Sequence, residues 1–346
     1  MRKGFLDRGL KDSYNTFLMA IIKAANPLAK IKGNFFKKNI LSISQFDIES
    51  FELLFEASLQ MKFIAVNALP SDILKGSIAT LLFYEPSSRT RGSFDAAIKQ
   101  LGGQTVVVEN PQQFSSVSKG ETFEDTIRVF ESYCDVIVLR HFDRGSSLKA
   151  AKAAQFVPII NAGDGIGEHP TQALLDMMTI KEHRKKLDNL IGVFGGDIKN
   201  GRTIHSLLKG LSIYPGNTAY LLSPKSLMLE REELALYKKS GLNIIEIESM
   251  EKIPKKADFW YWTRVQKERF ANVEEYKDVN NQFIVNSQNF NKLAGKETIL
   301  LHPLPRVGEI APSLDRDPRS QYLKSQVRNG MYARMALTAL VLGKLK

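Results

Sequence analysis

The chain has 346 residues, 43% of them hydrophobic and 25% charged, and this length and composition predict a globular protein of two domains. No apolar run in the sequence approaches the roughly 20 residues of a membrane-spanning helix. The single cysteine, Cys134, excludes an intramolecular disulfide and a cysteine-based zinc site, and it is typical of a reducing compartment. The formal net charge of +11 suggests a polyanionic partner, but residues 1–38 hold nine Lys and Arg against two Asp, which leaves only +4 for the rest of the chain.

The basic segment 1–38 comes first in the chain. We predict a helical extension or a disordered arm there, and an organelle-targeting segment is the alternative because such segments are basic and poor in acidic residues. Alternatively, the protein could bind DNA or RNA through residues 1–38, and such binding would weaken as the salt concentration rises. Nothing in the rest of the chain favours this alternative. We therefore expect a cytoplasmic protein that binds no nucleic acid and no membrane, with a plastid-like organelle as the alternative location.

From Asp47 onward, predicted strands alternate with predicted helices of about a dozen residues, a pattern that indicates parallel sheets covered on both faces. Asp47 is expected to cap a helix with its apolar side chains on one face. A final helix is predicted over residues 328–342. The predicted strands are 78–83, 105–108, 136–139, 157–161, 191–194, 219–222, 243–247, 259–262, 282–285 and 298–301.

The turn over residues 84–90 is the most informative stretch. It joins a predicted buried strand to a predicted helix that ends at glycines 102–103, so it lies where ligands bind in open α/β sheets. Ser87, Ser88 and Thr90 offer hydroxyl groups beside unpaired backbone N–H groups, and Arg89 offers a planar fork for two phosphate oxygens. The turn predicts an anion site, and the alternative is an ordinary Ser/Thr helix cap followed by exposed arginines.

Two further motifs follow predicted strands in the first half. Arg140 ends the strand 136–139, where a desolvated guanidinium needs an anion, either a ligand or a carboxylate of the protein. Pro170 suits the first position of a helix, which places His169 at the cap and Gln172 one turn inside. These two side chains should point toward one place, although a lone histidine is more often structural.

Several polar segments remain ambiguous when taken alone. The loop 110–120 can be a solvated linker, or its Ser115 and Lys119 can reach into an active site. Arg202 begins a helix after a glycine-rich turn whose spacing does not fit a dinucleotide-binding fingerprint, so we predict no NAD site. Arg264 and Gln266 lie in a charged run that can also be a solvated helix start.

The last motif follows the predicted strand 298–301. Leu304 lies between Pro303 and Pro305, and two prolines so close together fix a rigid, extended backbone whose carbonyl groups can hold an N–H donor.

In their order, these motifs resemble those of the aspartate and ornithine carbamoyltransferase family. Ser87-Ser88-Arg89-Thr90-Arg91 is similar to the family's carbamoyl-phosphate loop, Ser-Thr-Arg-Thr-Arg, with a serine for one threonine, so the hydroxyl group is kept. The Arg-His pair at 140–141, the His-Pro-Thr-Gln motif at 169–172 and the loop 110–120 also match.

The resemblance implies an α/β fold with two doubly wound parallel-sheet domains linked by helices, the last helix returning to the first domain. We expect a carbamoyl-phosphate-binding domain over 39–170 with helix 325–346, an aspartate-binding domain over 171–324, and an extension over 1–38.

The resemblance also implies a role for each site residue, and neither a metal nor a cofactor. The residues implied to bind carbamoyl phosphate are Ser87, Ser88, Arg89, Thr90, Arg140, His169, Gln172, Leu304 and Pro305. Those implied to bind aspartate are Ser115, Lys119, Arg202, Arg264 and Gln266. Catalysis is assigned to Arg89, Thr90, Lys119, Arg140 and His169.

The acceptor is suggested by one further comparison within the family. The chain lacks the Asp-x-x-Ser-Met-Gly signature of the ornithine enzymes and has Pro303 where they generally have cysteine. A dicarboxylate needs two bidentate arginines, and Arg202 and Arg264 are available. The resemblance implies carbamoyl transfer from carbamoyl phosphate to L-aspartate, an early step of de novo pyrimidine biosynthesis, with ornithine or another amine as the alternative acceptor. It also implies a homotrimer whose active sites are shared through loop 110–120, and it leaves a regulatory chain open.

Overall fold

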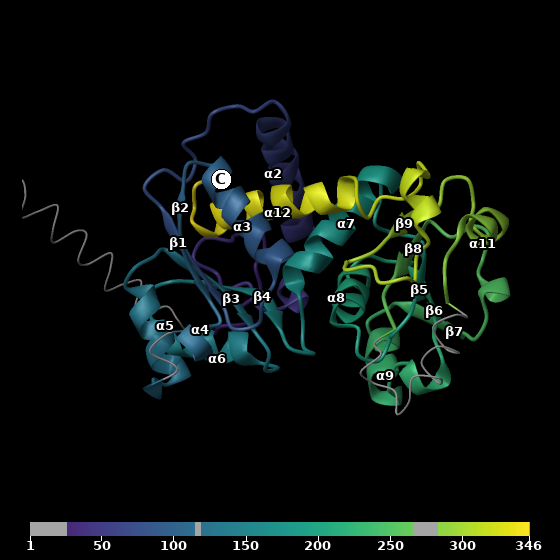
Figure 1. Ribbon diagram of the computed structural model, residues 1–346, viewed down its shortest axis with the longest axis horizontal. Coiled ribbons are helices and arrows are strands. Elements are labelled where there is room, and N and C mark those ends of the chain that lie inside the picture. The colour runs from purple at the N-terminus through teal and green to yellow at the C-terminus, as the bar shows by residue number, and fades with distance from the viewer. Residues whose placement is uncertain (1–25, 115–118, 266–282, 346) are drawn as a thin grey trace, which may run out of the picture.

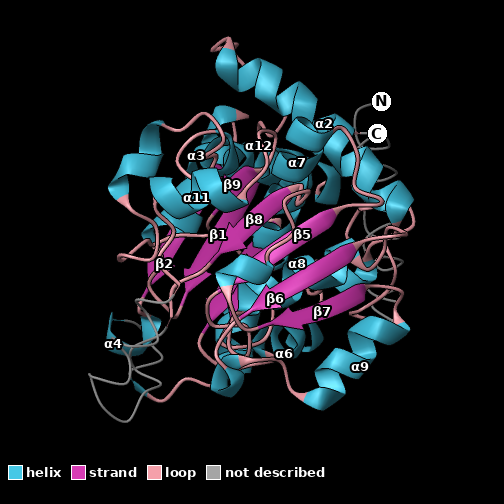
Figure 2. Cartoon of the chain, turned by 90° about the vertical axis from the view of Figure 1, so that its right-hand side faces the viewer, coloured by secondary structure: helices cyan, strands magenta, loops and turns pink. Residues whose placement is uncertain are grey.

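The computed structural model describes residues 26–114, 119–265 and 283–345, and it places two parallel sheets side by side with helices on both faces (Figure 1). The first sheet has the strand order β2-β1-β3-β4, with β1 (Ile78–Phe83), β2 (Gln104–Glu109), β3 (Val136–His141) and β4 (Ile159–Asp164). The second has the order β7-β6-β5-β8-β9 (Figure 2), with β5 (Ile191–Gly195), β6 (Thr218–Leu222), β7 (Asn243–Ile247), β8 (Phe259–Trp262) and β9 (Ile299–Leu301). The predicted doubly wound α/β fold is confirmed.

Helices connect the strands of each sheet, as parallel pairing requires. The Asp47 side chain accepts a hydrogen bond from the Ser50 backbone N–H and caps the first long helix, as predicted. The helices are α2 (Ile48–Val66), α3 (Ser88–Gln100), α4 (Pro111–Phe114), α5 (Phe123–Glu131), α6 (Ser146–Ala153), α7 (Pro170–Arg184), α8 (Arg202–Leu211), α9 (Arg231–Lys239), α11 (Ser287–Leu293) and α12 (Ser325–Val341), with short 3-10 turns at η1 (Ile43–Gln45), η3 (Lys225–Leu227), η4 (Met250–Lys252) and η6 (Pro312–Arg316).

Each sheet reverses its winding direction at one point. In the first sheet β2 and β3 lie on opposite sides of β1, and in the second β6 and β8 lie on opposite sides of β5. Loops diverge at such a point and leave a crevice beyond the carboxyl ends of the strands. The turn after β1 and the end of β3 border the first crevice, and the turns after β5 and β8 border the second.

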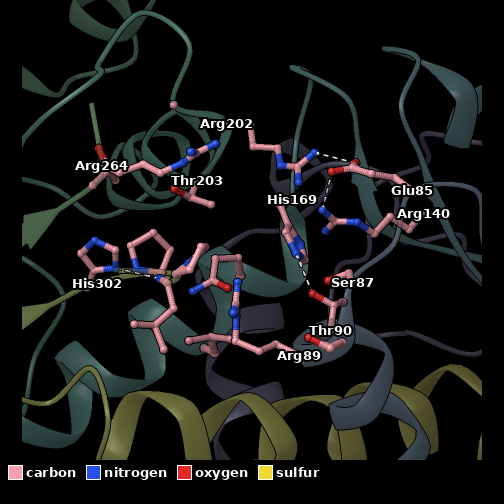
Figure 3. Close-up of a pocket in the computed structure, with 18 of the residues that line it drawn as sticks. Glu85, Ser87, Arg89, Thr90, Arg140, His169, Arg202, Thr203, Arg264 and His302 are labelled. Carbon is pink, nitrogen blue, oxygen red and sulfur yellow. Dashed lines mark hydrogen bonds and ion pairs between the residues drawn. The ribbon is translucent and has the colours of Figure 1, made fainter. Parts of the chain in front are cut away.

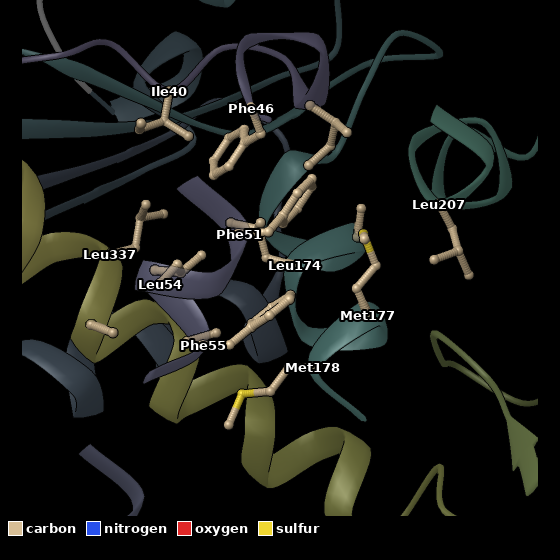
Figure 4. Packing of buried hydrophobic residues seen from close by; sticks show 14 of the residues in the cluster. Ile40, Phe46, Phe51, Leu54, Phe55, Leu174, Met177, Met178, Leu207 and Leu337 are labelled. Carbon is tan, nitrogen blue, oxygen red and sulfur yellow. The ribbon is translucent and has the colours of Figure 1, made fainter. Parts of the chain in front are cut away.

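One hydrophobic cluster joins the two sheets through their helices. Helix α12 packs against α2, α3 and α7, and α7 packs against α8 of the second half, so α12 returns to the first sheet as predicted (Figure 1). The cluster includes Phe51 and Phe55 of α2, Leu174 of α7 and Leu337 of α12 (Figure 4). Burying side chains of this size contributes roughly 2 kcal/mol each, so this cluster holds the loops of both sheets at fixed positions.

Three segments differ from their predictions. The predicted strand 282–285 is reduced to a single bridge between Val285 and Ile310 among the described residues, Gln282 lying outside them. Part of the predicted loop 110–120 forms α4, because a proline at residue 111 suits a first helical turn. Of the predicted extension 1–38, residues 1–25 lie outside the described residues, and residues 26–38 pack on the body instead of forming an arm, with Ile31 and Phe35 buried. Among the described residues, no helix is both long and apolar enough to cross a membrane.

Candidate active site

A cavity of about 680 Å³ opens between the two halves, beyond the carboxyl ends of the strands (Figure 3). Side chains from both halves line it, so the crevices of the two sheets face one another across it. It brings together eleven of the residues selected from the sequence: Ser87, Ser88, Arg89, Thr90, Arg140, His169, Gln172, Arg202, Arg264, Leu304 and Pro305.

The turn after β1 presents the amino-terminal end of α3 to this cavity. Helix α3 begins at Ser88, and the side chain of its cap residue, Ser87, makes no capping hydrogen bond. The serine hydroxyl is therefore not used as an ordinary cap, which was the alternative interpretation of this stretch. Backbone N–H groups, hydroxyl groups and the Arg89 guanidinium line one wall of the cavity, a set of donors suited to a phosphate.

Arg140, at the end of β3, is buried and bonds a carboxylate. Its Nη2 donates to Glu85 Oε1 at 2.8 Å, and Arg202 Nη1 lies 3.4 Å from the other oxygen of Glu85 (Figure 3). Burial, together with the positive charge of Arg202, lowers the pKa of Arg140 to about 10, and Glu85 opposes this shift. One carboxylate thus bridges a guanidinium of the first half and one of the second.

His169 is buried at the cap of α7, with Pro170 at the first helical position as predicted. Its backbone N–H donates to Ser206 Oγ at 3.0 Å, and its Nε2 lies 3.4 Å from Thr90 Oγ1. Burial, and then the positive charges of Arg140, Arg202 and Arg334, hold the pKa of His169 well below its usual value. The imidazole is therefore neutral at physiological pH and can donate a single N–H to an oxygen without carrying a charge.

The second half contributes two arginines from separate elements. Arg202 is the first residue of α8, and Arg264 follows β8 by two residues; both line the cavity. Figure 3 shows Arg264 on the opposite side of the cavity from Glu85 and Arg140. Two guanidinium groups that project into one cavity from different elements can each hold one carboxylate of a dicarboxylic acid.

The segment after β9 completes the wall. His302 Nδ1 accepts the Leu304 N–H at 2.8 Å, and His302 Nε2 bonds Glu309 Oε1 at 2.6 Å. The Leu304–Pro305 peptide bond is cis. His302 therefore fixes the backbone at Leu304 and Pro305, which line the cavity and which the resemblance to the family assigned to the site.

The structure does not place the other three predicted site residues in this cavity, two of them because they are not described. Ser115 and Gln266 lie outside the described residues. Lys119 is described, and it is an exposed residue that does not line the cavity. Within the described residues, no group of three or more His, Cys, Asp or Glu side chains is arranged to hold a metal ion.

Glu85 and Arg334 are charged cavity residues that were not selected from the sequence. Glu85 received no role, although a carboxylate directly after the strand 78–83 is a natural partner for Arg140. Arg334, in the middle of α12, is buried, donates to Ser93 Oγ at 3.0 Å and lies over the Phe94 ring. A single arginine within the otherwise apolar stretch of this helix from Met331 to Leu337 is the signal that would have identified it.

Two family models cover the chain. The model described as the aspartate/ornithine carbamoyltransferase carbamoyl-P binding domain matches residues 38–182, and the Asp/Orn binding domain model matches residues 188–341.

Known proteins are similar over most of the chain. The aspartate carbamoyltransferase catalytic subunit of Clostridium botulinum (strain Eklund 17B) is 45% identical over 89% of this chain and 99% of its own length. The multifunctional protein pyr1-3 of Dictyostelium discoideum is 44% identical over 88% of this chain, which spans only 14% of that longer protein. The crystal structure of aspartate transcarbamoylase from Trypanosoma cruzi in complex with N-(phosphonacetyl)-L-aspartic acid superposes with a TM-score of 0.83, at 37% identity, over 91% of this chain and 99% of that one. The chain belongs to the aspartate/ornithine carbamoyltransferase family.

Proposed function

We propose that this chain is a transferase that moves the carbamoyl group of carbamoyl phosphate to the amine of L-aspartate, an early step of de novo pyrimidine biosynthesis. The observation that carries the proposal is the convergence of Arg89, Arg140, Arg202 and Arg264, from four separate elements, on one cavity that also holds His169. A phosphate and two carboxylates are the anions that such a set of cations can neutralise together.

Carbamoyl phosphate binds in the turn after β1. Its phosphate accepts from the α3 backbone N–H groups, from the Ser87, Ser88 and Thr90 hydroxyls and from Arg89, and Arg140 closes the anion site. Glu85 already bonds Arg140 at 2.8 Å, so the phosphate competes with this carboxylate and shifts it toward Arg202.

The carbamoyl carbon then faces the second half. The amine of aspartate attacks this carbon, the bond from carbon to the bridging phosphate oxygen breaks, and the departing phosphate accepts the proton from the amine. Negative charge builds on the carbamoyl oxygen in the transition state, and Arg89, Thr90 and neutral His169 donate hydrogen bonds to it. Gln172, Leu304 and Pro305 hold the carbamoyl NH₂.

Aspartate lies between the two halves, where Arg202 binds one carboxylate and Arg264 the other, with Gln266 assisting. Closure of the two halves expels water from the cavity and strengthens these ion pairs. Catalysis therefore comes from positioning two substrates and from electrostatic stabilisation, without a covalent enzyme intermediate. In this proposal, residues 39–170 and 325–346 form the domain that binds carbamoyl phosphate, and residues 171–324 form the domain that binds aspartate.

The working assembly is a homotrimer in which each site takes Lys119 and Ser115 from a neighbouring chain. Support for this comes from Lys119 itself: it is exposed and does not line the cavity of its own chain. A cation borrowed from a neighbour adds to the charge that binds aspartate, so an isolated chain has little activity. The cytoplasm is the proposed compartment, with a plastid-like organelle as the alternative.

A comparison of acceptors tests the proposed function. With carbamoyl phosphate present, the purified chain should form N-carbamoyl-L-aspartate from L-aspartate and no citrulline from L-ornithine, because Arg202 and Arg264 attract a second carboxylate and repel a cationic side chain. Colorimetric detection of the ureido product with each acceptor measures both activities. Equal or greater turnover with ornithine would refute the choice of aspartate.

A further inference from the structure

A fully buried carboxylate behind the cavity has no role in the chemistry described so far. Asp176 lies on α7, one turn after Gln172, and its side chain is inaccessible to solvent. An isolated carboxylate in such a position is strongly destabilising, so its presence needs compensation by donors. Burial raises the pKa of Asp176 to about 7, while its hydrogen-bond donors and the charge of Arg334 act in the opposite direction.

Three donors from three elements converge on this carboxylate. Oδ1 accepts from Gln172 Nε2 at 2.9 Å and from Gln326 Nε2, at the start of α12, at 2.7 Å. Oδ2 accepts from the Tyr261 hydroxyl of β8 at 2.8 Å. Asp176 thus connects the interdomain helix α7, the returning helix α12 and the strand that leads to Arg264.

The orientation of the two amides follows from this arrangement. Gln326 Oε1 accepts the backbone N–H of His302 at 2.9 Å, which fixes the Gln326 amide independently and leaves its NH₂ group for Asp176. An ionised carboxylate can only accept, so Gln172 must also present its NH₂ group to Asp176. The carbonyl oxygen of Gln172 is then the end of this amide that is available to the cavity, which Gln172 lines.

We propose that Asp176 is a positioning residue: by accepting from the Gln172 NH₂ group, it turns the Gln172 carbonyl oxygen toward the carbamoyl NH₂ of the substrate. The inference rests on the proposed function, because it assigns Asp176 to the recognition of carbamoyl phosphate. An amide turned the other way would present its own NH₂ group to the substrate NH₂, and two donors would face one another. Asp176 therefore lets the site distinguish a carbamoyl group from an acyl group of the same size.

The probe for this discrimination is acetyl phosphate, which carries a methyl group where carbamoyl phosphate carries NH₂. The ratio of the Ki for acetyl phosphate to the KM for carbamoyl phosphate reports recognition of the NH₂ group, since both molecules share the phosphate. Both constants are measured well above pH 7, the approximate pKa of Asp176, so that its carboxylate is ionised. Asp176→Leu keeps the approximate size of the side chain but removes both acceptor oxygens, so nothing holds the Gln172 NH₂ group away from the substrate. The ratio is expected to fall about tenfold, the effect of losing one buried hydrogen bond.

Two controls separate positioning from a general loss of stability. Tyr261→Phe removes the donor to Oδ2 without turning Gln172, so it should lower Tm and leave the ratio unchanged. In a Gln172→Met background the ratio is already low, and adding Asp176→Leu should lower it no further, because both changes act through one amide.

The proposal is overturned if Asp176→Leu folds and keeps the wild-type ratio, or if it lowers the ratio equally in the Gln172→Met background. Thermal unfolding establishes which variants fold. The Gln172→Met variant keeps Asp176, so it can be measured even if the Asp176 variant does not fold. An unchanged ratio in Gln172→Met also overturns the proposal. Failure of the proposed function is distinguishable, since the wild-type chain would then form no carbamoyl aspartate.

Discussion

Replacing Arg89 by alanine is expected to lower kcat by about 10³-fold while the fold stays intact. In the proposed mechanism Arg89 binds the phosphate and also donates to the carbamoyl oxygen where charge develops, so both binding and the transition state would lose a guanidinium. Its side chain lines the cavity and contributes nothing to the hydrophobic core. Steady-state kinetics, together with a thermal unfolding curve, separate lost catalysis from lost structure.

Arg91, two residues along the same helix, is the matched control. Its Nε pairs with Glu109 at 2.6 Å on the partly exposed surface of the first sheet, away from the cavity. Such a surface ion pair is worth less than about 1 kcal/mol, so Arg91→Ala should retain nearly full kcat and a similar Tm. Near-normal turnover in Arg89→Ala, or equal losses in both variants, would contradict the role assigned to Arg89.

Mixing two inactive variants is expected to restore activity. Lys119→Ala and Arg89→Ala chains should each be almost inactive as pure proteins. In a mixed trimer, one interface joins an intact Arg89 from one chain to an intact Lys119 from its neighbour. Random assembly of equal amounts gives mixed trimers in about three quarters of cases, each with one complete site of three, so about a quarter of the wild-type activity should return.

Co-expression of the two variants with different affinity tags allows the mixed trimers to be isolated and assayed. The matched control is the same exchange between chains that both carry Lys119→Ala, which should recover nothing. If the isolated hybrids remain inactive, or if a single Lys119→Ala chain is fully active, the site is not shared between subunits.

The strand ends were predictable because buried parallel strands give a strong local signal. The strand limits of β1, β7 and β8 agree with those expected from apolar runs bounded by polar turns. Chemistry-bearing residues directly after such strands, Arg140 among them, then lie near one another because parallel strands end at the same edge of a sheet. The position of these residues along the chain indicated that they meet at one edge of a sheet, and the resemblance to the family implied that they share one site.

Pairings across long sequence separations were not predictable. Glu85 and Arg140 are 55 residues apart, and Asp176 and Gln326 are 150 apart. Periodicity describes which face of an element is buried and says nothing of which polar group meets which in the interior. Helix α7 is buried on nearly all sides between the two halves, so its sequence has only a weak periodic pattern of apolar residues. That pattern gives no signal that would distinguish Asp176 from the other polar residues of the helix.

The predicted strand 282–285 failed for a related reason. The alternating apolar side chains are buried, but the backbone of this segment does not form a strand. Phe283 and Val285 pack in a hydrophobic cluster with Trp260, and Val285 makes a single β-bridge, to Ile310. Side-chain burial and strand pairing are separate requirements, and a short apolar run reports only the first.

Calorimetric titration with a bisubstrate analogue that joins a phosphonate to L-aspartate tests the central claim most directly. If Arg89 and Arg140 hold the phosphonate while Arg202 and Arg264 hold two carboxylates in the same cavity, the joined molecule should bind at one site per chain, at least about 100-fold more tightly than a simple phosphonate or succinate alone. Binding no tighter than the better of the two halves, or simultaneous binding of a second analogue molecule, would contradict a single site that neutralises all three anionic groups together.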